Sequence, residues 1–284
     1  MNTVKSIQEV RSAVAAARGQ GMRIGFVPTM GALHEGHRSL VRAAGKECGF
    51  VVVSIFVNPT QFGPKEDLSR YPRTPETDLA ACREEGAALV FMPEVETMYP
   101  PGAATTISVS GLTRSLCGAS RPTHFAGVCT IVAKLFNIVE PDCAYFGNKD
   151  FQQACVIERM VADLDMPVRV VRCPIVREAD GLAMSSRNAN LSSEHRRQAA
   201  GLHEALTLAA ATIRDSAPPA AEVIELMRRR LDESAPAGRV DYIQIVDPQT
   251  LAGVEETDGP VLVALAVKFG PTRLIDNVLV GPED

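Results

Sequence analysis

The sequence predicts an α/β protein, with a Rossmann-like, doubly wound parallel sheet domain over residues 1–174 and a smaller α+β domain over residues 175–284. Two observations predict this class. In the first part, continuous apolar runs such as residues 50–57 alternate with helical patterns, and such runs are typical of parallel strands buried on both faces. Beyond Pro174, two helical segments precede three apolar strands without further alternation, which is typical of an α+β domain.

The first domain shows strand and helix patterns in turn. We expect strands at residues 23–28, 50–57, 88–92, 143–146 and 168–173. Helices are expected at residues 35–46, 75–85, in the apolar stretch that ends at 137, and from 151 onwards. The N-terminal residues 1–14 have the pattern of an amphipathic helix, and the polar, proline-rich stretch 64–75 favours an exposed loop. Residues 98–118 show no clear period and receive no assignment.

The second domain opens with a polar linker, residues 177–188, which contains a Ser-Ser-Arg cluster. Helices are then expected at residues 193–213 and 220–231, and antiparallel strands at residues 242–246, 261–269 and 272–280. Gly181 gives the linker a flexible position. We therefore expect the Ser-Ser-Arg cluster to swing onto bound phosphates when the two domains approach each other.

Composition excludes several classes of protein. The 284 residues carry a net charge of -5, with 46% hydrophobic and 22% charged residues, as in soluble globular proteins. No apolar run approaches the roughly 20 residues of a membrane span, and no signal-peptide core is present at the N-terminus. The seven cysteines show no CxxC pair, so neither a zinc site nor a redox dithiol is expected. We expect a cytoplasmic protein with reduced thiols, no protein-built metal site, and no membrane or nucleic-acid partner.

The segment Gly25–His37 carries the first functional motif. It predicts a buried strand, a turn and a helix that starts at about Glu35. His34 and His37 lie three residues apart and so share one face of the first helical turn, where unpaired backbone N–H groups and the helix dipole favour an anion. Gly36 allows a ligand to approach the backbone. The pattern suits a polyphosphate, and the alternative is a surface accident or a transient metal contact.

Polar residues follow the next strand and precede a later helix. Gln61 offers both a donor and an acceptor at the carboxyl end of a strand, where ligands bind in open α/β sheets. Asn58 could simply cap a turn, which is the commoner role of an asparagine that precedes a proline. His124 is either a structural histidine or a ligand-binding one, and the sequence leaves both alternatives open.

A second strand–loop–helix junction lies at Gly147–Asp150. Glycine permits close backbone approach, Lys149 supplies a compact positive charge, and the helix start adds its dipole. The alternative is a solvated surface lysine. Gln153, on the first turn of the following helix, could reach the same cleft as Gln61.

These motifs carry a family resemblance. The segment PTMGALHEGH resembles the HIGH-type signature of the nucleotidyltransferase superfamily. With FVNPTQF, RPTHFAGV, AYFGNKDFQQ, READGLAMSSRN and GPTRLIDN, in the family's order over almost the whole chain, the sequence is similar to the pantothenate synthetase family. One departure is Asn190, where many relatives have an aromatic residue, and it concerns local packing. The resemblance implies ATP-dependent condensation of (R)-pantoate with β-alanine through an enzyme-bound pantoyl adenylate, with release of AMP and pyrophosphate. It also implies Mg²⁺ and a homodimer.

The resemblance also implies roles for individual residues, carried over by motif position. The catalytic residues are His34, His37, Lys149, Ser185, Ser186 and Arg187, of which His37 is also a proton donor. The ATP-binding residues are Met30, Gly31, Ala32, Leu33, His34, Glu35, Gly36, His37, Gly147, Asn148, Lys149, Asp150, Val176, Met184, Ser185, Ser186 and Arg187. Among them Gly147 and Asp150 meet the ribose, and Val176 and Met184 line the adenine pocket. Pantoate and β-alanine are held by Gln61, Gln153, Pro28 and Met30.

Two other functions fit part of the pattern. A nucleotidylyltransferase would share the HxGH helix but would transfer AMP onto a phosphate acceptor and would lack the paired glutamines. A non-catalytic nucleotide-sensing module would not need Lys149. An aminoacyl-tRNA synthetase is disfavoured, because no tRNA-binding extension is evident.

Overall fold

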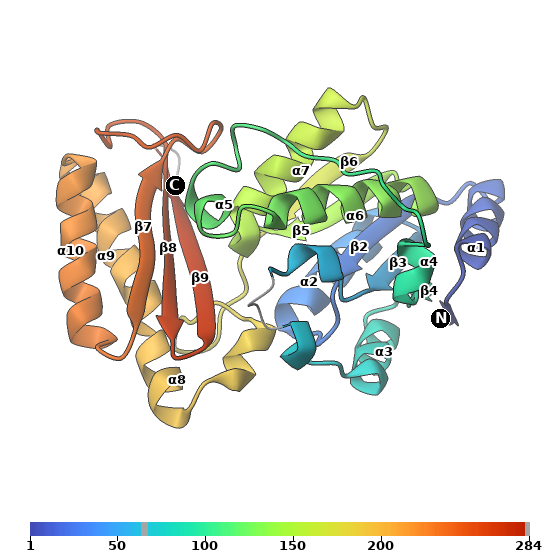
Figure 1. Ribbon diagram of the computed structural model, residues 1–284, viewed down its shortest axis with the longest axis horizontal. Coiled ribbons are helices and arrows are strands. Elements are labelled where there is room, and N and C mark those ends of the chain that lie inside the picture. The colour runs from blue at the N-terminus through green and yellow to red at the C-terminus, as the bar shows by residue number, and fades with distance from the viewer. Residues whose placement is uncertain (64–67, 282–284) are drawn as a thin grey trace. The chain divides into compact units, whose positions relative to one another are not determined.

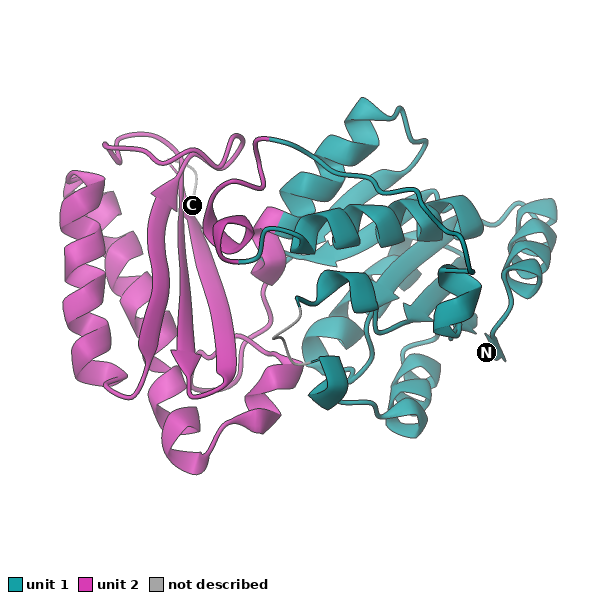
Figure 2. Ribbon diagram, in the orientation of Figure 1, with its two compact units in different colours: residues 1–110, 121–148, 153–174 teal, residues 111–120, 149–152, 175–284 magenta. Residues whose placement is uncertain are grey.

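The computed structural model describes residues 1–63 and 68–281. The chain separates into two compact units (Figure 2). Unit 1 comprises residues 1–110, 121–148 and 153–174, and unit 2 comprises residues 111–120, 149–152 and 175–284. Two short segments from the N-terminal part of the sequence, 111–120 and 149–152, therefore group with the C-terminal part of the chain.

Unit 1 is built on a six-stranded parallel sheet (Figure 1). Its strands are β1 (Asn2–Val4), β2 (Ile24–Thr29), β3 (Phe50–Ile55), β4 (Leu89–Phe91), β5 (Cys143–Gly147) and β6 (Arg169–Cys173). They lie in the order β1-β4-β3-β2-β5-β6. The predicted Rossmann-like parallel sheet is confirmed. The expectation that the N-terminal residues are helical is wrong for residues 2–4, because β1 pairs with β4, whose residues lie far away in the sequence.

Helices cover both faces of this sheet. They are α1 (Ile7–Gly19), α2 (Glu35–Glu47), α3 (Pro75–Glu84), α4 (Val95–Met98), α6 (His124–Val139) and α7 (Phe151–Asp163), the first two residues of α7 belonging to unit 2. Successive side chains of a strand point to opposite faces. Val27 and Val53 therefore join the core under α2 and α3, whereas Phe26 contacts Phe136 of α6, with ring centroids 6.3 Å apart. Burial on both faces explains why these strands are apolar throughout.

The strand order creates one switch point, between β2 and β5. From β2 the chain proceeds through β3 to β4 on one side, and β5 and β6 lie on the other side of β2. Ligands of doubly wound sheets bind outside the carboxyl ends of the strands at such a point. Here those ends lead into residues 30–37 after β2 and residues 147–150 after β5, which are the two junctions singled out from the sequence.

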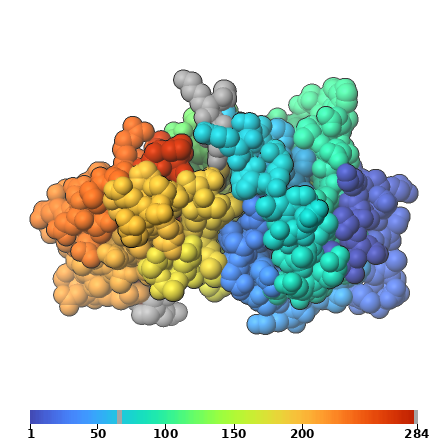
Figure 3. All heavy atoms as spheres, turned by 90° about the horizontal axis from the view of Figure 1, so that it is seen from below, coloured from blue at the N-terminus to red at the C-terminus, as the bar shows by residue number. Residues whose placement is uncertain are grey.

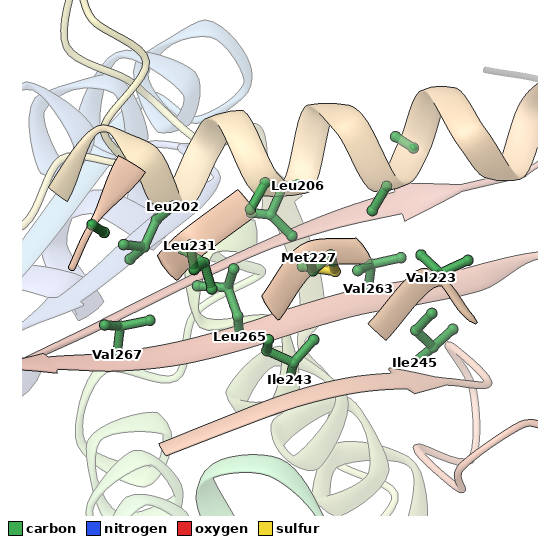
Figure 4. Packing of buried hydrophobic residues seen from close by; sticks show 14 of the residues in the cluster. Leu202, Leu206, Val223, Met227, Leu231, Ile243, Ile245, Val263, Leu265 and Val267 are labelled. Carbon is green, nitrogen blue, oxygen red and sulfur yellow. The ribbon is translucent and has the colours of Figure 1, made fainter. Parts of the chain in front are cut away.

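Unit 2 has a three-stranded antiparallel sheet covered by two helices. Its elements are α5 (Leu116–Ser120), α8 (Ser193–Ala199), α9 (Gly201–Ser216), α10 (Ala220–Ser234), β7 (Arg239–Val246), β8 (Val261–Phe269) and β9 (Thr272–Val280). The strand order is β7-β8-β9 with antiparallel pairing, as predicted. Figure 4 shows the core between helices and sheet, where Leu206 of α9 and Met227 of α10 lie over Val263 and Leu265 of β8.

Three differences from the sequence prediction concern boundaries. The single helix expected over residues 193–213 is two helices, α8 and α9, that meet at Ala200. Gly201 approaches α10 so closely that a Cβ atom there would lie 2.4 Å from the Ser234 Oγ atom. The unassigned stretch 98–118 contains the start of α5. In the loop expected over residues 64–75, residues 64–67 lie outside the described residues, and Tyr71 is buried against Phe62.

Within residues 1–63 and 68–281, none of the helices combines the length and the apolar character that crossing a bilayer requires. All seven cysteines lie in the described part of the chain, where each is buried and none forms a disulfide.

Candidate active site

The β2–α2 junction is shaped by two consecutive residues with positive φ. Gly31 has φ 82° and Ala32 has φ 50°, a region that non-glycine residues rarely adopt. The turn is held from α3. The backbone N–H groups of Ala32 and Leu33 donate to the two carboxylate oxygens of Asp78, at 3.0 Å and 2.8 Å. Both N–H groups lie outside sheet and helix, so Asp78 supplies acceptors that the regular structure does not.

His34 and His37 together cap α2. His34 is the N-cap residue, and its Nδ1 atom accepts the Gly36 N–H at 3.1 Å. The Nδ1 atom of His37 accepts the His34 N–H at 3.3 Å. The two rings are close, with centroids 4.1 Å apart. A ring nitrogen that accepts a hydrogen bond carries no proton, so each neutral ring bears its proton on Nε2. The Nδ1 atom of each imidazole is therefore committed to the cap of α2.

This geometry corrects one expectation about the helix end. The sequence suggested that unpaired backbone N–H groups would bind an anion here. Instead the Gly36 N–H is bonded to His34, and the His37 N–H donates to the His34 carbonyl oxygen at 2.8 Å. Both backbone groups are therefore already paired within the first turn of α2.

Glu35, expected among the ATP-binding residues, lies in a surface ion-pair network. Its carboxylate pairs with Arg42 and lies 3.7 Å from Arg38. Arg42 and Arg38 also reach Glu85, the C-cap residue of α3, at 2.8 Å and 2.6 Å. The space-filling view from below shows α2 and α3 side by side at the surface (Figure 3). The Glu35 side chain is thus engaged by arginines of its own helix.

The loop after β3 is fixed by Asn58, which is 1% exposed. Its Oδ1 atom caps the short 3-10 helix Pro59–Gln61 and accepts the Tyr99 hydroxyl at 2.8 Å. Its Nδ2 atom donates to the carbonyl oxygen of Gly127 at 3.1 Å. Asn58 is therefore a cap, which is the commoner role that its place before a proline indicated.

Gln61 ends this 3-10 helix and is 8% exposed. Its backbone carbonyl oxygen accepts Arg121 Nη2 at 3.1 Å and lies 2.9 Å from His124 Nδ1. The latter contact supports the structural alternative for His124. Among the described residues, the Gln61 side-chain amide has no hydrogen-bond partner, so a nearly buried donor and acceptor are available to a ligand.

Adjacent glutamines at the start of α7 have different surroundings. Gln152 is 5% exposed, and its Nε2 atom donates to the carbonyl oxygens of Leu112 and Ser115 at 2.8 Å and 2.9 Å. It therefore anchors the segment 111–120 within unit 2. Gln153 is half-buried. Its side-chain amide has no hydrogen-bond partner in the part of the chain that the structure describes, which leaves the amide available.

In unit 2, Lys149 contacts the segment that carries the Ser-Ser-Arg cluster. Its Nζ atom donates to the Met184 carbonyl oxygen at 3.2 Å, and its own carbonyl oxygen accepts Asn277 Nδ2 at 3.0 Å. Asp150, the next residue, is exposed. Lys149 is thus held by two segments of unit 2, rather than being a solvated surface lysine.

Residues 176–184, which include the first part of the stretch 177–188 expected to be a polar linker, form a hairpin. Met184 N–H donates to the Val176 carbonyl oxygen at 3.0 Å, and Arg177 and Ala183 form a bridge. The Arg177 guanidinium makes a bidentate ion pair with Asp276 of β9, at 2.6 Å and 3.0 Å. Because the Asp276 side chain is 1% exposed, the pair holds the hairpin firmly to β9.

The expectation that Gly181 is a flexible position is wrong. Gly181 has φ 89° at the tip of this hairpin, and a Cβ atom there would lie 2.2 Å from the Cδ2 atom of His203. Glycine is required for the turn and for its close approach to α9. Burial lowers the pKa of His203, and the nearby Arg177 charge adds to that effect, so both disfavour a charged ring beside Gly181.

The Ser-Ser-Arg cluster follows the hairpin in a short 3-10 helix, Ser186–Asn190. The Ser185 Oγ atom caps it by accepting the Arg187 N–H at 3.3 Å. Asn188 ties the turn to the hairpin by donating to Glu178 Oε1 at 2.8 Å. Asn190 is exposed, so the missing aromatic residue leaves no hole in the core.

The structure thus places the expected site residues in two groups. In unit 1, His34, His37, Gln61 and Gly147 lie at or just after the carboxyl ends of β2, β3 and β5. In unit 2, Lys149, Met184 and Ser185 form a connected group. Sequence reasoning missed Asp78. Its only sequence signal is an acidic residue in the first turn of a helix, which is common at helix starts.

The comparisons with known proteins identify the family of the chain. The sequence profile of the family described as pantoate-beta-alanine ligase matches residues 2–279. The chain belongs to that family. It is 54% identical over 284 residues to the pantothenate synthetase of Moorella thermoacetica, covering 100% of both chains.

Solved structures of family members have the same fold. The chain superposes on the pantothenate synthetase of Thermus thermophilus with a TM-score of 0.93 and 47% identity, covering 99% of this chain and 100% of that one. It superposes on the pantoate-beta-alanine ligase of Francisella tularensis, complexed with beta-gamma ATP and beta-alanine, with a TM-score of 0.81 and 33% identity. That alignment covers 98% of this chain and 97% of the other. As a member of the pantoate-beta-alanine ligase family, the chain is an enzyme of the ligase class.

Proposed function

We propose that the chain condenses (R)-pantoate with β-alanine to form pantothenate, while ATP is cleaved to AMP and pyrophosphate. The reaction passes through an enzyme-bound pantoyl adenylate. Family membership supports the overall reaction, and the Francisella tularensis structure with a nucleotide and beta-alanine supports these two ligands. The observation that carries the proposal is the His34–His37 pair, whose rings are fixed by capping hydrogen bonds directly after β2, at the sheet's switch point.

In the first step, a carboxylate oxygen of pantoate attacks the α-phosphorus of ATP. The bond from that phosphorus to the bridging oxygen breaks, and pyrophosphate leaves with the electron pair. Negative charge grows on the α-phosphate oxygens and on the leaving group, so the enzyme's main task is to stabilise that charge. Donors in fixed positions do so without reorganisation, and the capping hydrogen bonds of His34 and His37 fix both rings.

In the second step, the amine of β-alanine attacks the acyl carbon of the adenylate. The bond from that carbon to the phosphate-bound oxygen breaks, AMP leaves, and the amine loses a proton as the amide forms. The half-buried Nε2 atoms of the histidine pair are suited to exchange a proton with the departing phosphate group. We assign this role to His37, in line with the family resemblance.

The family resemblance implies further nucleotide-binding residues, which we take one unit at a time. In unit 2, Lys149 and the Ser185–Arg187 turn supply an ammonium group, hydroxyls and a guanidinium for the phosphates, and Val176 and Met184 supply apolar surface for adenine. The β5 end and the residues after it, Gly147 and Asp150, bind the ribose. Residues 30–33 contribute backbone groups beside the histidine pair.

The pantoate site is proposed in unit 1. Gln61 and Gln153 have amides without partners among the described residues, and such amides complement hydroxyl and carboxylate groups. Pro28 at the end of β2 and Met30 after it provide an apolar wall for the gem-dimethyl group.

We further propose that Mg²⁺ enters on the polyphosphate of ATP. Magnesium keeps several waters and is held by substrate phosphates with one or two carboxylates at most. The described residues offer no group of three or more histidine, cysteine, aspartate or glutamate side chains for a metal, which suits an ion held chiefly by phosphates. We also propose a homodimer, on the family resemblance, and a cytoplasmic location, on the seven buried thiols.

The decisive experiment is ATP–pyrophosphate exchange. With ATP, Mg²⁺ and pantoate present and β-alanine absent, the purified chain should move labelled pyrophosphate into ATP, because the first step is reversible and needs no amine. Omitting pantoate is the control and should abolish the exchange. Exchange that continues without pantoate, or AMP release only after a phosphate acceptor is added, would point to a nucleotidylyltransferase instead.

A further inference from the structure

Asp78 of α3 is a buried carboxylate with no assigned role. The residue is 1% exposed, and its carboxylate accepts three hydrogen bonds. The donors are Ala32 N–H at 3.0 Å, Leu33 N–H at 2.8 Å and the Thr74 hydroxyl at 3.1 Å. A buried charge is costly unless such partners satisfy it. Two of the three donors belong to the turn that precedes His34.

The turn that Asp78 holds has an unfavourable backbone. Gly31 and Ala32 both have positive φ, at 82° and 50°. Residues that carry a Cβ atom rarely adopt this region of φ. The Asp78 Oδ2 atom would lie 3.0 Å from a Cβ atom at Gly31. The carboxylate therefore packs directly against Gly31 while it accepts the N–H of Ala32. These acceptors anchor the strained turn to α3.

The turn determines where the histidine pair lies. Leu33, whose N–H is bonded to Asp78, directly precedes His34. His34 has the extended backbone of an N-cap residue, with φ -122° and ψ 177°, and in this conformation its Nδ1 atom accepts the Gly36 N–H. The Nδ1 atom of His37 in turn accepts the N–H of His34. A displacement of residues 32–33 would thus displace both imidazole rings.

We propose that Asp78 is a positioning residue for phosphoryl chemistry at His34 and His37. It fixes the two imidazole rings by holding the backbone of Ala32 and Leu33. The inference rests on the proposed function for the chemistry, but its structural part, the effect of Asp78 on the two imidazoles, can be measured without any activity.

The test uses Asp78→Asn in the full chain. The amide is nearly isosteric, but its NH₂ group cannot accept one of the two backbone N–H groups. We expect the pantoate-dependent exchange rate at saturating substrates to fall by about tenfold to a hundredfold, as a small misplacement of catalytic groups does. The ATP dissociation constant should stay within about twofold, because most nucleotide contacts lie elsewhere. Glu76→Gln is the matched control, since Glu76 is an exposed acidic residue on the same helical turn.

The second readout is the tautomer of each imidazole, from ¹H–¹⁵N correlation spectra of the ring nitrogens. The chain has five histidines, and His34→Asn and His37→Asn identify the two of interest. Asp78→Asn should turn the Nε2–H pattern of His34 into a tautomer mixture and leave His195 and His203 unchanged. If Asp78→Asn does not fold, Thr74→Val removes one of the three donors and should shift the same signals less.

An unchanged His34 spectrum in a folded variant overturns the proposal, whether or not the rate falls. A changed spectrum with an unchanged rate overturns it as well, because position would then not matter for the chemistry. If the unaltered chain shows no pantoate-dependent exchange, the proposed function fails, and the spectra alone decide whether Asp78 positions the histidines.

Discussion

The Nζ atom of Lys149 donates a hydrogen bond to the backbone carbonyl oxygen of Met184, 3.2 Å away. The contact joins the loop after β5 to the hairpin that precedes the Ser-Ser-Arg turn, although 35 positions separate the two residues. A carbonyl oxygen satisfies only one of the three ammonium protons. Lys149 is therefore oriented within unit 2 while it retains donors for a phosphate oxygen.

Replacing Lys149 by alanine should lower the rate of adenylate formation by about a hundredfold or more, because a positive charge directed at the growing negative charge is lost. Single-turnover measurement with ATP and pantoate gives this rate. Lys46→Ala removes an exposed lysine from the last turn of α2 and should change nothing. A near-normal rate for Lys149→Ala at saturating ATP would remove Lys149 from the phosphate site.

The two nitrogens of His34 can be separated by substitution. His34→Asn keeps an acceptor near the position of Nδ1, so it should cap α2 and preserve stability, but it has no group at Nε2. His34→Ala loses the cap as well, at a cost of about 1 kcal/mol. We expect both variants to lose about a hundredfold in adenylation rate, and only His34→Ala to unfold at lower denaturant concentration. An active His34→Asn enzyme would show that capping is the only role of this residue.

The adjacent glutamines of α7 should respond differently to replacement by alanine. Gln153→Ala, like Gln61→Ala, should weaken pantoate binding and leave ATP binding almost unchanged, because its amide is available to a ligand. Gln152→Ala should lower stability, since it removes both hydrogen bonds to the segment 111–120. Calorimetric titration with pantoate and ATP separates the two effects. Loss of ATP affinity in Gln61→Ala or Gln153→Ala would place that residue in the nucleotide pocket instead.

Acid stability should depend on Asp241 in β7. Burial alone would raise the pKa of Asp241, but hydrogen bonds from Lys268, Arg273 and Ser120 outweigh it and lower that pKa to about 2. Because the folded pKa lies below the unfolded value of about 3.9, the stabilisation is complete above that value and is lost as pH falls towards 2. Asp241→Asn should therefore cost about 2 kcal/mol at pH 7 and much less at pH 2.

Denaturant unfolding at several pH values between neutral and about 2 measures this difference. Asp258→Asn, which neutralises an exposed carboxylate of the same unit, is the control and should cost little at any pH. Equal destabilisation by Asp241→Asn at both ends of the range would show that the ion pairs do not provide the stability.

The cysteines should be inert in the folded enzyme. Burial raises the pKa of the Cys82 and Cys129 thiols to about 11, so neither is a thiolate at neutral pH. Mild alkylation of the native protein should label the seven cysteines slowly and leave turnover unchanged, whereas denatured protein should be labelled fully. Rapid inactivation that keeps pace with the labelling of one native cysteine would assign that thiol a role.

Local sequence signals predicted the regular elements well. The strand expected at residues 261–269 is β8, and the one expected at residues 272–280 is β9. The signals failed where a distant segment decides the conformation. β1 exists because it pairs with β4. The segment 111–120 is held by Gln152, by Gln244 of β7 and by the Leu251 carbonyl oxygen. None of these partners is visible in a local pattern.

For the candidate site, the sequence by itself determined which side chains are present and which junctions carry them. Two histidines at the start of a helix after a buried strand, and a lysine after another strand, follow from residue order and strand periodicity alone. The family resemblance follows from the same residues. These properties are local, because a strand that ends and a helix that begins leave their signals within a few residues of each other.

Only the tertiary structure decided which atoms those side chains present. His34 and His37 direct their Nδ1 atoms to backbone N–H groups and so cap α2. Asp78 holds the turn before them from another helix, and Asp276 holds the hairpin through Arg177. The physical reason is common to all three cases. A hydrogen bond forms only where the folded chain brings its donor and acceptor together. When the two residues are far apart in sequence, no local periodicity predicts that contact.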